Sequence, residues 1–198
     1  RGFGAQSKVG LEAMRQISYY GQNQSLSGEA LQLAGELLYN QASTQRKKAE
    51  IVRLKGGSVN ELQSSLKNYY TEAMNLENAY APLFKLGDGF WGIRALYDLG
   101  GIYENFAGQL ANPPEISGAK KSDVQAQLKT TYDQIKQKSD AFYQNALTTA
   151  QKLSVLSPVL PALWDKLKGT HQNQLSKLIP HFDLVSIQIN QGIAVTQW

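Results

Sequence analysis

Residues 122–153, SDVQAQLKTTYDQIKQKSDAFYQNALTTAQKL, carry one unbroken helical pattern. Their apolar side chains recur in steps of three, four or seven residues, with Ser139 completing the series. The stripe comprises Val124, Leu128, Tyr132, Ile135, Phe142, Ala146, Ala150 and Leu153. Such steps keep side chains on one face of an α-helix, and Ser122 with Gln125 three residues later is typical of a capping box. The stretch therefore predicts one long helix over residues 122–153.

The same period extends toward the N-terminus. It predicts a helix over residues 28–54, ended by Gly56-Gly57, whose polar middle over 41–48 we expect to project beyond the core. A further helix runs from Ser58 to Leu76, with Glu61 as the capping partner of Ser58. The spacing of Val9, Ala13, Ile17 and Tyr20 predicts a first helix near the start of the chain.

Proline marks the remaining helix boundaries. A helix over Trp91–Leu110 stops at Asn112-Pro113-Pro114, because proline lacks an N–H and disfavours helix in the residue before it. Ser157-Pro158 is typical of a helix start and predicts a helix through about Leu178.

The end of the chain has a different period. Val185, Ile187 and Ile189 alternate as in a strand, but no partner strand is evident, and a lone strand is unstable. We therefore expect an all-α protein of antiparallel helical hairpins with one extended helix pair, in a domain over residues 1–180, followed by an extended, irregular tail over residues 181–198.

Composition excludes several classes of protein. Of the 198 residues, 42% are hydrophobic and 18% charged, which argues against intrinsic disorder. With no cysteine, disulfides, thiol nucleophiles and cysteine-based metal sites are excluded, and an oxidising compartment is permitted. No apolar run approaches the ~20 residues of a membrane span. Because the sequence begins at Arg1, we expect a processed or trimmed chain.

Residues that could carry catalysis are scattered. His171 and His181 do not share a helix face or a metal-ligand spacing. Residues 87–92, GDGFWG, match a dinucleotide-binding motif by letter, but the stretch before them is not strand-like, so a turn between helices is predicted. Carboxylates such as Asp98 and Glu104 are expected to be solvated. The sequence thus predicts no enzyme, cofactor, metal site or small-molecule substrate.

Two stretches resemble the tetratricopeptide repeat (TPR). Residues 69–76, YYTEAMNL, place an aromatic residue three positions before Ala73, as the second helix of such a repeat does. Residues 95–103, ALYDLGGIY, contain the Leu-Gly-x-x-Tyr pattern of its first helix, in which the glycine lets the paired helix approach closely. That paired helix would carry Tyr143 and Ala146. The resemblance implies a TPR-like α-solenoid.

The residues that follow narrow the resemblance. The run Ile102–Ala107, then Leu110, Asn112 and Pro114 before the long helix, resembles a group of TPR proteins of deltaproteobacteria that includes gliding-motility and cell-envelope proteins. Such proteins act as scaffolds that bind other proteins. The resemblance implies a non-enzymatic scaffold with a protein or peptide partner in an envelope complex, and a periplasmic or envelope-associated location.

It also implies where a partner would bind. If Leu99 and Gly100 pack inward, then Arg94, Tyr97, Glu104 and Asn105 face the opposite, concave side, the usual binding groove of a helical solenoid. Tyrosine and arginine suit peptide binding, because they offer a large contact area. These four residues are the predicted partner-binding site.

A second class of function remains open. Arg46-Lys47-Lys48, Arg53 and Lys55 could form a patch at one helix end that binds nucleic acid or an anionic membrane surface, in a peripheral association that weakens as salt rises. Nucleic acid is the less favoured partner, because a formal net charge of +4 over 198 residues makes a weak basic footprint.

Overall fold

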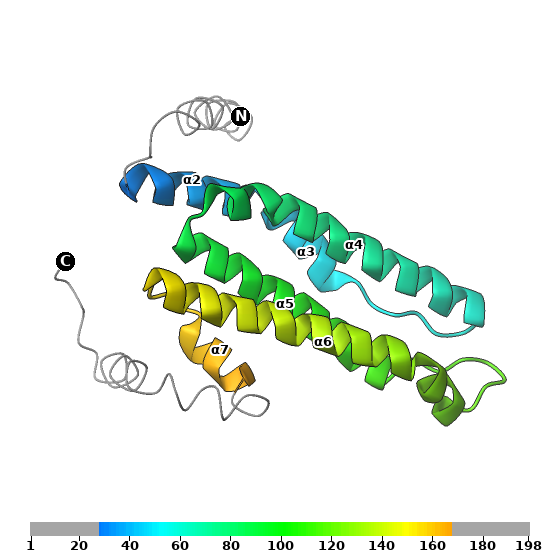
Figure 1. Ribbon diagram of the computed structural model, residues 1–198. Helices are drawn as coiled ribbons and strands as arrows, with labels where there is room; N and C mark the ends of the chain where they lie inside the picture. The colour runs from blue at the N-terminus through cyan, green and yellow to red at the C-terminus, as the bar shows by residue number, and fades with distance from the viewer. Residues whose placement is uncertain (1–27, 168–198) are drawn as a thin grey trace, which may run out of the picture.

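The computed structural model describes residues 28–167 (Figure 1). Six helices account for most of this part of the chain: α2 (Gly28–Gln41), α3 (Ser43–Ile51), α4 (Val59–Leu86), α5 (Gly89–Ala111), α6 (Lys121–Leu153) and α7 (Leu160–Leu167). Within the described range there is no strand, and an isolated bridge joins Gly57 to Ile116. The all-α prediction is confirmed. The predicted first helix and the predicted tail lie outside the described residues.

The helix predicted over residues 28–54 is two helices. The chain turns at Ala42, between α2 and α3, and leaves helical geometry at Val52 rather than at the glycine pair. Nor does the polar middle project. Ala42 and Ala49 are buried, and the Arg46 guanidinium points inward, where its Nη1 lies 2.9 Å from Asp98 Oδ2. The prediction failed because the partner of Arg46 lies on α5, 52 residues further along the chain, which no local pattern shows.

Helix α4 begins where the sequence predicts and ends later. The Ser58 hydroxyl accepts a hydrogen bond from the Glu61 N–H at 3.2 Å, which confirms the predicted cap. The helix then continues past Leu76 because its buried face continues, through Tyr80 and Leu83. It stops at Gly87, whose φ of 78° is left-handed and costs glycine little.

Helices α5 and α6 form a long antiparallel pair, with α5 between α4 and α6 (Figure 1). Gly100 permits their close approach: a Cβ there would lie 2.5 Å from Tyr143 Cδ1. The hydroxyl of Ser139, itself fully buried, donates to the Gly100 carbonyl at 2.9 Å. The predicted pairing of Leu99-Gly100 with a helix that carries Tyr143 is confirmed.

Two of the predicted N-terminal capping patterns are wrong. Helix α6 has Lys120 at its N-cap with no side-chain hydrogen bond, and Gln125 instead donates to the Ala111 carbonyl at 2.8 Å, across the preceding loop. Helix α7 begins at Leu160 rather than at Ser157-Pro158, and the Ser157 hydroxyl has no hydrogen-bond partner. The described part of α7 ends at Leu167, and the rest of the predicted helix lies outside the described residues.

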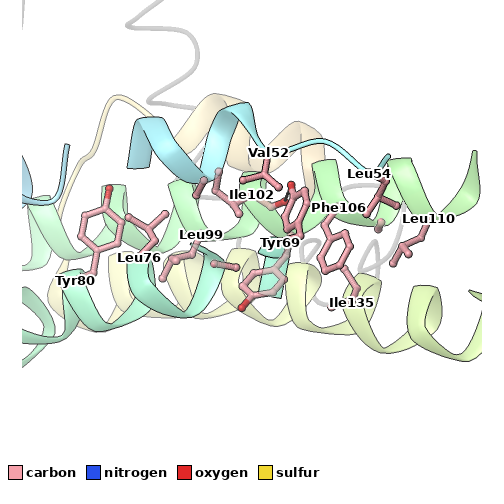
Figure 2. Close-up of a cluster of buried hydrophobic side chains, with 14 of the residues drawn as sticks. Val52, Leu54, Tyr69, Leu76, Tyr80, Leu99, Ile102, Phe106, Leu110 and Ile135 are labelled. Carbon is pink, nitrogen blue, oxygen red and sulfur yellow. Dashed lines mark hydrogen bonds between the residues drawn. The ribbon is translucent and has the colours of Figure 1, made fainter. Parts of the chain in front are cut away.

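The core is aromatic and falls into two parts. The larger one contains residues of α2, α3, α4, α5 and α6. Figure 2 shows its central residues, among them Tyr69, which stacks on Phe106 with ring centroids 3.9 Å apart. The smaller one holds α7, whose Leu160, Leu163 and Leu167 pack with Ile93 of α5 and with the C-terminal half of α6. Helix α7 is therefore fixed by its own apolar stripe against the α5/α6 pair.

Candidate functional site

A pocket of about 340 Å³ opens where α3, α5, α6 and α7 meet. Helix α5 supplies most of its lining, and one residue comes from each of the others. The lining residues are Glu50 of α3, Tyr97, Asp98, Gly101, Ile102, Glu104 and Asn105 of α5, Tyr143 of α6 and Lys166 of α7. Its wall thus joins residues that are far apart in the sequence.

The helical period of α5 explains its share of the wall. Tyr97, Gly101 and Glu104 follow one another in steps of four and three residues, so they lie along one face of the helix. The neighbouring face carries Leu99, which is fully buried in the core. One side of α5 therefore builds the core while the adjoining side lines the pocket.

Glu104 receives two donors at the α6 and α7 side of the pocket. The Tyr143 hydroxyl donates to Glu104 Oε2 at 2.9 Å, and Lys166 Nζ lies 2.7 Å from the same oxygen. Burial, and then the Glu104 carboxylate, raise the pKa of Tyr143 far above its ordinary value, so its hydroxyl stays protonated as a donor. The ring of Tyr97 lies beside that of Tyr143, with centroids 5.6 Å apart.

Asp98, another lining residue, accepts hydrogen bonds from three side chains. Its Oδ2 accepts hydrogen bonds from Tyr39 at 2.7 Å, from Tyr80 at 2.8 Å and from Arg46 at 2.9 Å. Burial alone would lower the pKa of Arg46, but the Asp98 carboxylate raises it above its ordinary value, so the guanidinium is firmly charged. Arg46 also lies 3.6 Å from Glu50, a second carboxylate of the pocket wall. The Glu50 and Asp98 carboxylates are therefore both paired with the Arg46 guanidinium.

The structure brings three of the four predicted binding residues together. Tyr97, Glu104 and Asn105 all line the pocket, and the amide of Asn105, an exposed residue, accepts from Gln109 Nε2 at 2.6 Å. Arg94 is not among the lining residues. Its guanidinium lies 5.2 Å from the ring centroid of Tyr39 and 5.6 Å from that of Trp91, over the α2/α5 contact.

Sequence reasoning missed the pairing of the carboxylates. The expectation that Asp98 is solvated is wrong, because its side chain is 19% exposed and accepts hydrogen bonds from three other side chains. Glu104 stays 39% exposed, but it too is paired, with Tyr143 and Lys166. Asp98 sits four residues before Ile102 of the apolar stripe, and this flanking position was the available signal. For Lys166, which reaches the pocket from α7, the sequence holds no comparable signal.

The predicted basic patch is also reduced. Arg46 turns inward to Asp98, and Arg53 Nη1 donates to the backbone carbonyls of Glu50 and Val52, both at 2.7 Å. The exposed residues of the patch are Lys47, Lys48, Arg53 and Lys55. Backbone carbonyls do not neutralise a guanidinium, so Arg53 keeps its charge. The part of the patch that is free to attract an anion is therefore smaller than the sequence suggests.

The glycine motif at residues 87–92 joins two helices. Gly87 ends α4, and the Asp88 carboxylate caps α5 by accepting from the Trp91 N–H at 2.7 Å. A dinucleotide site of this type needs a strand before the glycines, so the predicted turn between helices is confirmed. His171 and His181 lie outside the described residues.

Within residues 28–167 no group of three or more histidine, cysteine, aspartate or glutamate side chains is placed to hold a metal ion. None of the helices described there combines the length and the apolar character needed to cross a bilayer.

Comparisons of the chain with protein-family models, with curated proteins and with solved structures gave no match. The pocket and the arrangement of the helices around it are therefore the observations from which a function can be proposed.

Proposed function

We propose that this protein is a non-enzymatic interaction scaffold that binds a segment of a partner protein in the pocket between α3, α5 and α7. One observation carries the proposal: an open pocket is lined mainly by α5 and by one residue each of α3, α6 and α7, and its lining includes Tyr97 and the exposed Asn105. Tyrosine and amide side chains offer contact area and hydrogen bonds to a peptide at little cost in entropy.

The arrangement of helices supports this choice of class. Helices α3, α5 and α7 contribute to the pocket, α6 contributes through Tyr143, and no α4 residue is among its lining. In α-solenoids built from helix pairs, the first helices of successive pairs line the concave binding surface. A TPR-like solenoid, with α4 and α6 as the second helices of two pairs, is the architecture that we propose on this basis.

The cellular setting belongs to the same proposal. The likeness of residues 95–114 to TPR proteins of deltaproteobacterial envelopes supports a partner in a cell-envelope assembly, with a periplasmic or envelope-associated protein and a link to motility. The alternative, a basic module for nucleic acid or an anionic membrane surface, has less support, because Arg46 is paired with the Asp98 carboxylate within the chain.

A peptide selection tests the proposal. The full chain is immobilised and presented with a displayed library of random peptides, and enriched peptides are measured by fluorescence anisotropy at low and near-physiological salt. We expect saturable binding that survives the higher salt and is lost in the Tyr97→Ala/Asn105→Ala double variant. Tyr70→Ala/Asn78→Ala is the matched control, because both residues are exposed on α4, away from the pocket lining.

Two results would refute the scaffold. One is a selection in which no enriched peptide responds to the Tyr97→Ala/Asn105→Ala change. The other is retention of RNA or of anionic vesicles that falls steeply as salt rises and is indifferent to both double variants, which is the behaviour of counterion release at a basic patch.

A further inference from the structure

An ammonium group from the chain itself already occupies one side of the pocket. Lys166 Nζ lies 2.7 Å from Glu104 Oε2, and both side chains keep 39% of their surface exposed. The lysine reaches this position from α7, an eight-residue helix held through its other face by Leu160, Leu163 and Leu167. Moving the Lys166 side chain aside therefore leaves the packing of α7 intact.

The carboxylates of the pocket differ in what neutralises them. Glu50 and Asp98 pair with Arg46, which lies outside the pocket lining, whereas the charge partner of Glu104 is a lining residue with a flexible side chain. A half-exposed lysine–carboxylate pair changes an equilibrium constant only fewfold, because water screens it. A second ammonium can therefore displace Lys166 at little cost.

The surroundings of Glu104 suit a lysine side chain. The Tyr143 hydroxyl fixes the carboxylate by donating to its Oε2 at 2.9 Å, and the Tyr97 ring lies beside Tyr143 at a centroid distance of 5.6 Å. An aromatic wall next to a carboxylate packs against the methylene stem of lysine and attracts its cationic head. The site thus combines a cavity, a fixed anion and an aromatic wall, with an ammonium seated in it.

We propose that the partner segment binds by placing a lysine ammonium against Glu104, in the position that Lys166 holds in its absence. Lys166 is then a competitor built into the chain, and its displacement makes the pocket selective for partners that bring their own cation. This inference rests on the proposed function, since it names the chemistry of the partner for the same pocket.

Nuclear magnetic resonance titration of the full chain tests it. The probes are Nα-acetyl-lysine methylamide and its uncharged analogue Nα-acetyl-norleucine methylamide, followed through the backbone amides of Tyr97 and Glu104. We expect these signals to respond to the lysine probe and not to the norleucine probe. Lys166→Met should tighten binding of the lysine probe by about two- to fivefold, and Glu104→Gln should weaken it by about threefold or more.

The controls are an equivalent pair outside the pocket. Lys129 Nζ lies 3.1 Å from Asp133 Oδ2 on α6, and both side chains are more than half exposed. Lys129→Met and Asp133→Asn should leave probe binding unchanged. The two pocket variants have opposite expected signs, so a general loss of folding cannot imitate the pattern.

Equal responses to the two probes, or affinity indifferent to Lys166→Met and Glu104→Gln, would overturn the inference. If peptides from the library still bind in a manner that depends on Tyr97, the scaffold function survives, and only the inference that a partner lysine binds at Glu104 is wrong. If neither peptides nor probes respond to Tyr97→Ala, the proposed function fails together with the inference.

Discussion

Adding a single methyl group at Gly100 should destabilise the protein, although alanine is the better helix former. The Cβ would lie 2.5 Å from Tyr143 Cδ1 and 2.9 Å from Cζ. Carbon atoms pack best at about 3.5–4.0 Å, so the ring would have to move by about 1 Å. Tyr143 is 2% exposed and its hydroxyl is tied to Glu104, so little room is available for that movement.

The expected change in the free energy of unfolding follows from two opposing effects. Overpacking of a filled core costs about 1–3 kcal/mol, and this site belongs to the upper part of that range because the ring cannot easily shift. Replacing glycine by alanine inside a helix returns about 1 kcal/mol. Gly100→Ala should therefore lower the free energy of unfolding by about 1–2 kcal/mol.

Gly101→Ala is the matched control, one residue along the same helix. A Cβ there meets only the Tyr143 hydroxyl oxygen, at 3.8 Å, which is ordinary van der Waals contact. The free energy of unfolding of this variant should rise by about 0.5–1 kcal/mol, from helix propensity alone. Urea unfolding followed by circular dichroism measures both variants against the parent chain.

Two outcomes test whether Gly100 of α5 lies against Tyr143 of α6. Gly100→Ala should cost less in a Tyr143→Ala background, because the ring that it meets is gone. A Gly100→Ala protein as stable as the Gly101→Ala protein would refute the close approach of α5 and α6 at this glycine.

Two further predictions concern helix caps and alkaline pH. Ser58→Ala should lower the free energy of unfolding in urea by about 1 kcal/mol, because it removes the α4 cap. Ser122→Ala should change it by less than about 0.5 kcal/mol, since the Ser122 hydroxyl donates to Asp123 and caps no helix. Equal losses in the two variants would contradict the assigned caps. Burial raises the pKa of Tyr69 to about 12 against 10 in the unfolded chain, so its share of stability holds below pH 10 and is lost as pH rises through 12. Unfolding at pH 9 and 11 should show a smaller loss for Tyr69→Phe than for the parent, and an equal loss would count against this assignment.

The parts of the fold that follow from sequence are the long periodic helices. Helix α6 could be predicted to within a residue, since its stripe repeats without interruption from Val124 to Ala150. The contact of Gly100 with Tyr143 was expected as well, but from the resemblance to the tetratricopeptide repeat, which implies a close approach at this glycine by a helix that carries Tyr143. The turn at Ala42 could not be predicted, because alanine is compatible with helix and neither glycine nor proline stands next to it.

The site was predictable only along one helix. Tyr97, Glu104 and Asn105 share a side of α5, so the helical period brings them together. Glu50 and Lys166 join them through tertiary packing, which no local pattern encodes. The same reason hides the role of Asp98, whose three donors come from α2, α3 and α4.

The bridge between Gly57 and Ile116 joins two loops that the sequence keeps far apart. The Gly57 N–H donates to the Glu115 carbonyl at 2.9 Å, and the Ser117 N–H donates to the Gly57 carbonyl at 3.0 Å. The two loops therefore hold each other in place at this end of the helices, where α4 begins and α6 is about to begin. An insertion next to Gly57 would break both hydrogen bonds, whereas one nearer the end of α3 could bulge outward and leave them in place.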